Sequence, residues 1–414
     1  MIYNRFSDYL KNKYGSKVYK LPVNLCTTCP NRSDMGRQTK DVVNGDIVNT
    51  DTELPVRPAT DSAVRLAAGP SADSAAGLAV GPAADSAARL AAGPFADSAA
   101  GLAAGPAADS AAGLAAGPSA DSAARPFDES AGGTAYRKKG CIFCGDEGAD
   151  FELLSPEMTI TEQLESNRRY IGEKYKAGKY IAYFQNYSNT YLPLEVFKKA
   201  MREACADDVV ALYISTRPDC IDDARVGFLN QLKQEKGVDV VVELGLQSVN
   251  PATLRWLKRG HGLAEFVDAV LRLKGSGIEI CTHMINDLPT DDVADVIEGA
   301  KFLSALQIDQ VKCHSLYVLE NTELGDLYRS GDFKPLDMDE FIERTILFLE
   351  YLNPEIVVQR LIGRAPAERT LFCSWNTSWR KIHDTIVEKM QAEGRYQGRH
   401  FNYLNGSALR GLDN

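Results

Sequence analysis

Short apolar runs alternate with stretches of helical spacing along most of this 414-residue chain, and this alternation constrains the fold more than any other feature. Repeated strand–helix units form a parallel sheet with helices on its outside, which is an α/β fold. An open or closed barrel of such units places its active site at the carboxyl ends of its strands. The predicted strands are Lys17–Leu25, Tyr180–Gln185, Val209–Ser215, Val238–Gly245, Ile278–Ile285, Val311–Val318 and Ile356–Arg360. The helical spacing falls in Leu194–Ala206, Ile221–Glu235, Leu263–Leu273 and Asp291–Leu306.

Polar side chains stand at these predicted strand ends. They are Gln185 with Asn186, Ser215 to Arg217, Glu243 with Gln247 and Ser248, and His283. Polar residues inside a barrel also serve structural purposes, so one of them alone indicates little. Their common position, opposite the segment that carries the paired cysteines, favours a functional site.

Two Cys-x-x-Cys pairs, Cys26 with Cys29 and Cys141 with Cys144, flank a long low-complexity stretch. The chain has nine cysteines and no secretory pattern at Met1–Phe6, which fits a reducing cytoplasm. In a reducing compartment such pairs hold a metal or form a redox couple rather than a structural disulfide.

The stretch between the pairs repeats every 12 residues, with an Asp-Ser marker that recurs from Asp61 to Asp121. Gly-Pro interrupts each alanine-rich run, and helices this short are marginal in water. We predict a mostly disordered insertion over residues 43–135, although a solenoid or a binding tract remains an alternative. Loop closure over the added length costs about 2 kcal/mol, so the insertion does not by itself keep the cysteines apart.

The charge balance argues against some functions. The net charge is −10 and the isoelectric point is near 5.2, whereas a broad nucleic-acid footprint needs a basic face. No apolar run approaches the roughly 20 residues that span a bilayer. We therefore expect a soluble cytoplasmic protein with no membrane partner.

Several short strings occur together along the chain. They are Cys29-Pro30-Asn31-Arg32, Gly140-Cys141-Ile142-Phe143-Cys144, Tyr183-Phe184-Gln185-Asn186-Tyr187-Ser188-Asn189-Thr190, Ser215-Thr216-Arg217-Pro218-Asp219, Glu243-Leu244-Gly245-Leu246-Gln247-Ser248, Arg259-Gly260-His261 and Lys312-Cys313-His314. With these strings the chain resembles the YhcC-type branch of the radical S-adenosylmethionine (SAM) proteins. That branch is similar to oxygen-independent coproporphyrinogen oxidase and to the elongator catalytic subunit. The resemblance covers everything except the insertion, and it implies a partial (β/α)6 barrel that is similar to a TIM barrel.

The resemblance also implies a [4Fe–4S] cluster held by Cys29, Cys141 and Cys144. Three thiolates leave one iron open for the amino and carboxylate groups of SAM, whose reductive cleavage starts hydrogen abstraction from a substrate. The residues that the resemblance implies for cofactor binding are Phe143 beside the adenine, Arg217 on the SAM carboxylate, Gln185 and Asn189 near its amino group, Glu243 and Gln247 on the ribose or amino group, and Ser215 and His283. His283 and His314 are also candidates to face the substrate.

Three features depart from the family pattern. One is the insertion itself, and another is Cys26, where the resemblance leads us to expect a small residue. The third is the turn Asp287–Thr290, where relatives carry glycines, so that Asp287 and Thr290 are expected to crowd the adenine or to change the turn.

Two rival functions stay open. Cys26, Cys29, Cys141 and Cys144 form a set that suits a closed zinc site with four cysteine ligands, although zinc ribbons have shorter central spacings. A non-catalytic binding protein, with the repeat tract as its arm, is the other rival. The basic, aromatic stretch Arg395–Arg410 is expected to pack on the barrel rather than to bind RNA.

The chain divides into four predicted parts: an N-terminal segment at 1–42, the insertion at 43–135, the barrel core at 136–320 and a C-terminal extension at 321–414. The predicted partners are an electron donor such as flavodoxin or ferredoxin and a substrate that is a small molecule or RNA.

Overall fold

The computed structural model describes residues 2–25, 27, 29–30, 140–145, 153–365 and 369–410, all of which belong to one compact unit. Cys26, the predicted insertion and its two predicted boundaries at residues 42 and 135 lie outside the described residues.

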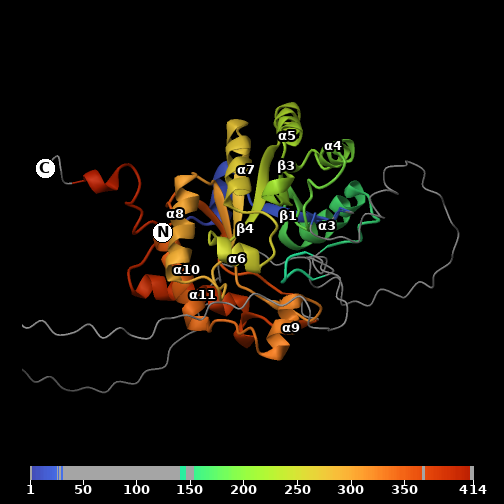
Figure 1. Cartoon of the computed structure of the whole chain (residues 1–414). Helices are drawn as coiled ribbons and strands as arrows, with labels where there is room; N and C mark the ends of the chain where they lie inside the picture. The colour runs from blue at the N-terminus through green and yellow to red at the C-terminus, as the bar shows by residue number, and fades with distance from the viewer. Residues whose placement is uncertain are drawn as a thin grey trace, which may run out of the picture. The chain divides into compact units, whose positions relative to one another are not determined.

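Seven parallel strands form one sheet, and their order along the sheet is their order in the chain (Figure 1). The strands are β1 (Val18–Val23), β2 (Lys179–Phe184), β3 (Val209–Thr216), β4 (Asp239–Gln247), β5 (Glu279–Ile285), β6 (Gln310–His314) and β8 (Val357–Arg360). The α/β fold and the partial barrel are therefore confirmed, with one strand more than six β/α units. The predicted strand Val311–Val318 divides into β6 and the short β7 (Val318–Leu319), which pairs antiparallel with β9 (Thr370–Phe372).

Helices connect the strands, and Figure 1 shows α5, α7 and α8 along the outside of the sheet. The helices are α1 (Phe6–Tyr14), α3 (Ile160–Tyr175), α4 (Leu194–Glu203), α5 (Asp223–Lys236), α6 (Pro251–Trp256), α7 (Leu263–Gly275), α8 (Val293–Ala305), α9 (Glu323–Ser330), α10 (Met338–Tyr351) and α11 (Trp379–Ala392). The predicted start of α5 at Ile221 is two residues early, because the Asp222 side chain accepts the Arg225 amide and caps the helix at that point.

The interior of the barrel is filled at one end by α1. Phe6 and Leu10 pack there with Tyr183, Tyr213 and other apolar residues of the inner sheet face. The backbone before α1 bonds to β8, and α1 itself contacts both edge strands, β1 and β8. The N-terminal helix therefore closes the open side of the sheet, and the polar part of the interior lies toward the carboxyl ends of the strands.

The C-terminal part packs onto the barrel. β8 belongs to the barrel sheet, so the predicted boundary at residue 320 separates strands that pair with each other. Arg395 bonds the buried Glu350 of α10 at 2.7 Å, and Tyr403 donates to the Tyr351 carbonyl at 2.5 Å. The stretch that carries these residues therefore packs as expected. Among the described helices, none has both the length and the apolar character that a membrane span requires.

Candidate functional site

The second cysteine pair lies in a short loop that two helices anchor. The Ile142 amide donates to the Leu257 carbonyl after α6 at 3.2 Å, and the Ile142 carbonyl accepts the Leu324 amide of α9 at 2.9 Å. The Ile142 side chain is buried among leucines. A turn in which the Cys144 amide donates to the Cys141 carbonyl then sets the two sulfurs close together.

The first cysteine segment reaches the same place from the end of β1. The Thr27 hydroxyl donates to the Ser188 carbonyl at 2.9 Å, and the Cys29 sulfur lies 3.3 Å from the Ser188 hydroxyl. Burial raises the pKa of Cys29, and the charge of Cys141 raises it further. The three predicted ligands therefore meet, although more than a hundred residues separate Cys29 from the loop.

Arg259 contacts the middle ligand directly. Its Nη1 donates to the Cys141 sulfur at 3.0 Å, and its Nη2 donates to the Gly245 carbonyl of β4 at 2.8 Å. A hydrogen bond from Cys144 and then the charge of Arg259 lower the pKa of Cys141 to about 5, whereas the pKa of Cys144 is raised. The surroundings of Cys141 therefore favour its thiolate form.

Sequence reasoning gave Arg259 no role. Its only signal was that Arg259-Gly260-His261 belongs to the matching strings. His261 lies 3.1 Å from the Arg259 guanidinium, and burial followed by the charge of Arg259 lowers its pKa to about 4. His261 therefore supports the position of Arg259 as a neutral side chain.

The donor set fits an iron–sulfur cluster. The three predicted sulfur ligands converge beside the cavity and the buried Arg259, which favours a thiolate at Cys141, and iron–sulfur clusters are held by thiolates. Since Cys26 lies outside the described residues, the fourth ligand of the zinc alternative stays a prediction.

A cavity of about 210 Å³ opens at the carboxyl ends of β2 to β6. Cys29 and Cys144 line it, and so does every predicted cofactor residue except Asn189, namely Phe143, Gln185, Ser215, Arg217, Glu243, Gln247 and His283. The structure therefore brings the predicted residues together in one concave site.

Asn189 is buried behind the cavity wall. Its amide donates to the carbonyl groups of Phe184, Asn186 and Ser215 at 2.9–3.0 Å. These bonds join the loop after β2 to the end of β3, so Asn189 positions the neighbouring cavity residues. Its contact with SAM stays a prediction.

Arg217 carries a free donor at the cavity wall. Its Nε and Nη2 donate to Asp219 at 2.8 and 2.6 Å. Its Nη1 is buried without a partner among the described residues. A buried donor of this kind fits a carboxylate oxygen, as predicted for the SAM carboxylate.

Glu243 lies on the floor of the cavity, and its carboxylate is shared among several donors. Its Oε2 accepts from Ser215 at 3.0 Å, Tyr183 at 3.1 Å and Lys312 at 3.1 Å. Its Oε1 lies 3.4 Å from the Lys20 ammonium, which is held over the Tyr183 ring. Burial alone would raise the pKa of Glu243, but the charges of Lys20 and Lys312 hold it well below its usual range. The predicted bond from Glu243 to SAM therefore competes with these contacts.

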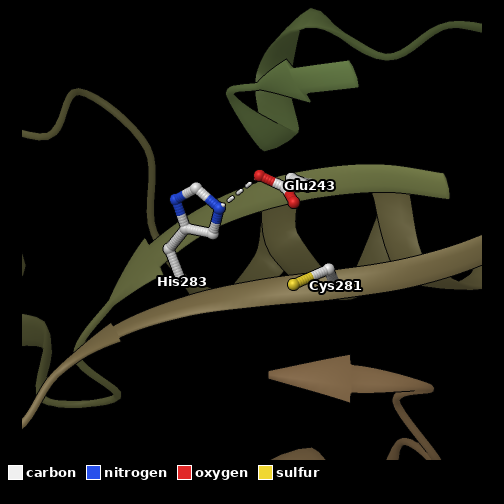
Figure 2. A group of neighbouring side chains, drawn as sticks. All are labelled: Glu243, Cys281 and His283. Atoms are coloured by element: carbon white, nitrogen blue, oxygen red, sulfur yellow. Dashed lines mark hydrogen bonds and ion pairs between the residues drawn. The ribbon is translucent and has the colours of Figure 1, made fainter. Parts of the chain in front are cut away.

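Three ligand-type side chains meet at this floor. Figure 2 shows His283 and Cys281 of β5 beside Glu243 of β4, with their ligand atoms within 4.8 Å of one another. His283 Nε2 lies 2.9 Å from Glu243, and burial, helped by the charge of Lys312, lowers the pKa of His283 to about 4. Two ammonium groups already contact Glu243, so a metal cation would be repelled here. The group is a hydrogen-bonded acid–base cluster.

The unusual turn after β5 is held by its own side chains. Asp287 accepts the Leu316 amide at 2.8 Å, and the Thr290 hydroxyl lies 2.8 Å from that of Thr253. Neither Asp287 nor Thr290 lines the cavity, so the expected crowding is not found there. Where the family pattern has glycines, this chain has side chains that form hydrogen bonds. The bond of Asp287 joins the turn to Leu316, which lines the cavity.

A parallel partial barrel has its active site at the carboxyl ends of its strands, and here three cysteine sulfurs converge beside a polar cavity at those ends. This arrangement is that of a barrel enzyme with an iron–sulfur cluster. The comparisons with known proteins agree with that class. Residues 138–303 match the radical SAM superfamily, and residues 308–392 match the radical SAM C-terminal domain. The chain belongs to the radical SAM superfamily, whose cofactors are a [4Fe–4S] cluster and SAM, and it is a radical SAM enzyme.

Its relatives include two bacterial proteins. It is 35% identical to the uncharacterized protein YtqA of Bacillus subtilis over 267 residues, which are 64% of this chain and 82% of YtqA. It is 26% identical to YhcC of Escherichia coli K12 over 237 residues, 57% of this chain and 75% of YhcC. The structure of the archaeal Elp3 of Methanocaldococcus infernus is similar with a TM-score of 0.51 and 21% identity, over 62% of this chain and 64% of that one. That likeness confirms the fold.

Proposed function

We propose that this chain binds one [4Fe–4S] cluster through Cys29, Cys141 and Cys144 and uses it to cleave SAM reductively. When bound, the cluster supplies the electron that splits SAM into methionine and a 5′-deoxyadenosyl radical for hydrogen abstraction. The observation that carries the proposal is the meeting of the three sulfurs at the wall of the cavity that the predicted SAM residues line.

The chain's own residues prepare the ligands. Arg259 stabilises the Cys141 thiolate, and Ser188 positions the Cys29 sulfur. The bond from the Arg259 guanidinium is charge-assisted, and such bonds are about twice as strong as neutral ones. The ligand sulfurs are therefore oriented before the cluster binds.

Other residues hold SAM on the side of β2 to β4. The free Nη1 of Arg217 takes its carboxylate, while Gln185 and Gln247 offer amide groups from two neighbouring strand ends. Gln247 has a φ of 80°, an uncommon backbone conformation that is found most often at functional sites. Phe143, between the two cysteines of the loop, packs beside the adenine.

Two requirements follow for the cell. Cleavage needs a one-electron donor, for which a small protein such as flavodoxin or ferredoxin is suited. Free thiols at the site need a reducing compartment, which favours the cytoplasm.

The test is the release of 5′-deoxyadenosine from SAM by anaerobically reconstituted protein with dithionite. We expect release from the wild type and from Cys205→Ala, whose sulfur donates to the Met201 carbonyl of α4, and none from Cys29→Ala. Cys26→Ala separates the three-cysteine site from the zinc alternative, because only a site with four cysteine ligands needs that residue. No release from protein with a full cluster would overturn the proposal.

A further inference from the structure

The interior of the barrel between β1, β6 and β8 carries more positive than negative charge. Lys20 of β1, Lys312 of β6 and Arg360 of β8 lie there, and Lys312 and Arg360 are direct neighbours in the strand register. Among the described residues, the one carboxylate that bonds any of the three is Glu243, which contacts both lysines. The described part of this region therefore holds three cations and one anion.

Arg360 is the cation that lacks a carboxylate partner among the described residues. Its Nη2 lies 2.7 Å from Nδ1 of His314, and its Nε is buried without a hydrogen bond to any residue that the structure describes. Burial, and then the charge of Arg360, hold the pKa of His314 well below its usual range. A neutral His314 does not compensate the charge of Arg360.

One member of the pair, His314, borders the cavity. His314 lines the cavity, together with Ser315 and His283. Gly363 packs against the pair, and a Cβ there would lie 3.0 Å from His314 Nδ1 and 3.6 Å from Arg360 Nη2. The Gly363 backbone therefore lies close to both groups, and a side chain at this position would crowd His314.

Buried charge without a counterion is costly, and the structure shows the strain on Lys312. Burial lowers the pKa of Lys312 to about 8, and the charges of Lys20 and Arg360 act in the same direction against the opposing effect of Glu243. An anion that enters beside Arg360 would balance this charge.

We propose that His314, Lys312 and Arg360 form a subsite for an anionic group of the substrate, either a carboxylate or a phosphate. The inference rests on the proposed function and gives its substrate class, namely small organic acids or phosphate esters. Arg217, the residue directly after β3, is the arginine assigned to the SAM carboxylate, whereas Arg360 ends β8. The substrate anion and the SAM carboxylate therefore have separate partners.

The test uses the full chain without cluster or SAM, so that its result does not depend on radical chemistry. Its five histidines are labelled with carbon-13 in their rings, and malonate and inorganic phosphate are titrated separately against chloride of equal ionic strength. We expect one or both anions to shift the His314 and His283 signals and to leave unchanged that of the half-buried His400, which lies beside Glu350. The anion that shifts them distinguishes a carboxylate from a phosphate.

Arg360→Gln supplies the second arm. We expect it to weaken binding of the anion about tenfold or more, since a charge-assisted hydrogen bond is lost. The control Arg329→Gln removes an exposed arginine of α9, whose partner is Asp326, and should bind as the wild type does. The native fold of each variant is checked from its backbone amide spectrum.

Three outcomes would overturn the subsite. The first is that the wild-type His314 signals respond to neither anion, and the second is that natively folded Arg360→Gln responds as the wild type does. The third comes from thermal shifts of reconstituted protein, if saturating SAM completely suppresses the effect of the anion. The last result would assign the subsite to SAM. Failure of 5′-deoxyadenosine release with an intact anion response would instead overturn only the radical function.

Discussion

The Arg259 guanidinium donates a hydrogen bond to the Cys141 sulfur across 3.0 Å, which joins the segment after α6 to the loop of the second cysteine pair. Arg259 is buried, and its other contacts hold it in place. A fixed arginine therefore holds the Cys141 sulfur in position.

Arg259→Gln should reduce iron and sulfide content after reconstitution severalfold. The change removes the charge that stabilises the Cys141 thiolate, and a protonated thiol is a poor ligand. Bound iron per chain measures the effect. The exposed Arg255 of α6 supplies the matched control Arg255→Gln, which should load like the wild type. Normal loading of Arg259→Gln would show that the bond does not assist the ligand.

Gly245→Ala should also reduce iron loading, because the added methyl group would displace Arg259. A Cβ at Gly245 would lie 2.9 Å from Arg259 Nη2 and 3.1 Å from Gln247 Nε2, so both side chains must shift. We expect lower iron content with the fold retained. The control is Gly227→Ala in α5, where nothing lies within 4 Å of the new Cβ and where alanine should add about 0.5–1 kcal/mol of stability. If Gly245→Ala binds as much iron per chain as the wild type, the close contact between Gly245 and Arg259 is not needed for cluster binding.

Asp287→Asn should raise thermal stability at pH 8 and flatten its dependence on pH. Burial raises the pKa of Asp287 from 3.8 to about 7, so between these values the folded state binds more protons than the unfolded state. The contribution of Asp287 is therefore complete below pH 4 and is lost as the pH rises through 7. Asparagine keeps an acceptor for the Leu316 amide without the charge.

Melting temperatures between pH 5 and pH 8 measure this difference. Asp326→Asn, which changes an exposed carboxylate of α9, should follow the wild-type profile. Identical slopes for Asp287→Asn and the wild type would contradict a buried, partly protonated Asp287.

Glu243→Gln should lower the free energy of unfolding by about 3–5 kcal/mol, because it leaves the buried ammonium group of Lys312 and the half-buried one of Lys20 without a counter-charge. Urea unfolding measures the loss. Adding Lys312→Met should recover part of it, since the second change removes one of the unpaired charges. Strictly additive losses in the double variant would mean that the carboxylate and the ammonium do not interact.

Much of the barrel could be predicted, because Val209–Ser215 and the other apolar runs have the length and spacing of buried strands. Helix starts such as that of α5 were less certain, since a capping side chain decides them locally. The cavity residues were largely predictable, because parallel strands present their carboxyl ends at one edge.

The floor of the cavity could not be predicted in the same way. Lys20 and Lys312 are far apart in the chain, and only the strand register places both on Glu243. Asn189 shows the converse, since its position in a family string indicates a cofactor contact while its amide bonds three carbonyl groups. The packing of α1 against both sheet edges also had no signal in the periodicity.

That placement of α1 has a consequence for the order of events during synthesis. The amide of Val358 in β8 donates to the Asn4 carbonyl, and Lys20 is held between the Phe6 ring and Gln359. The segment around Asn4 therefore waits for a partner that is translated more than three hundred residues later. Such non-local contacts form late, so α1 completes the barrel only after β8 has been made.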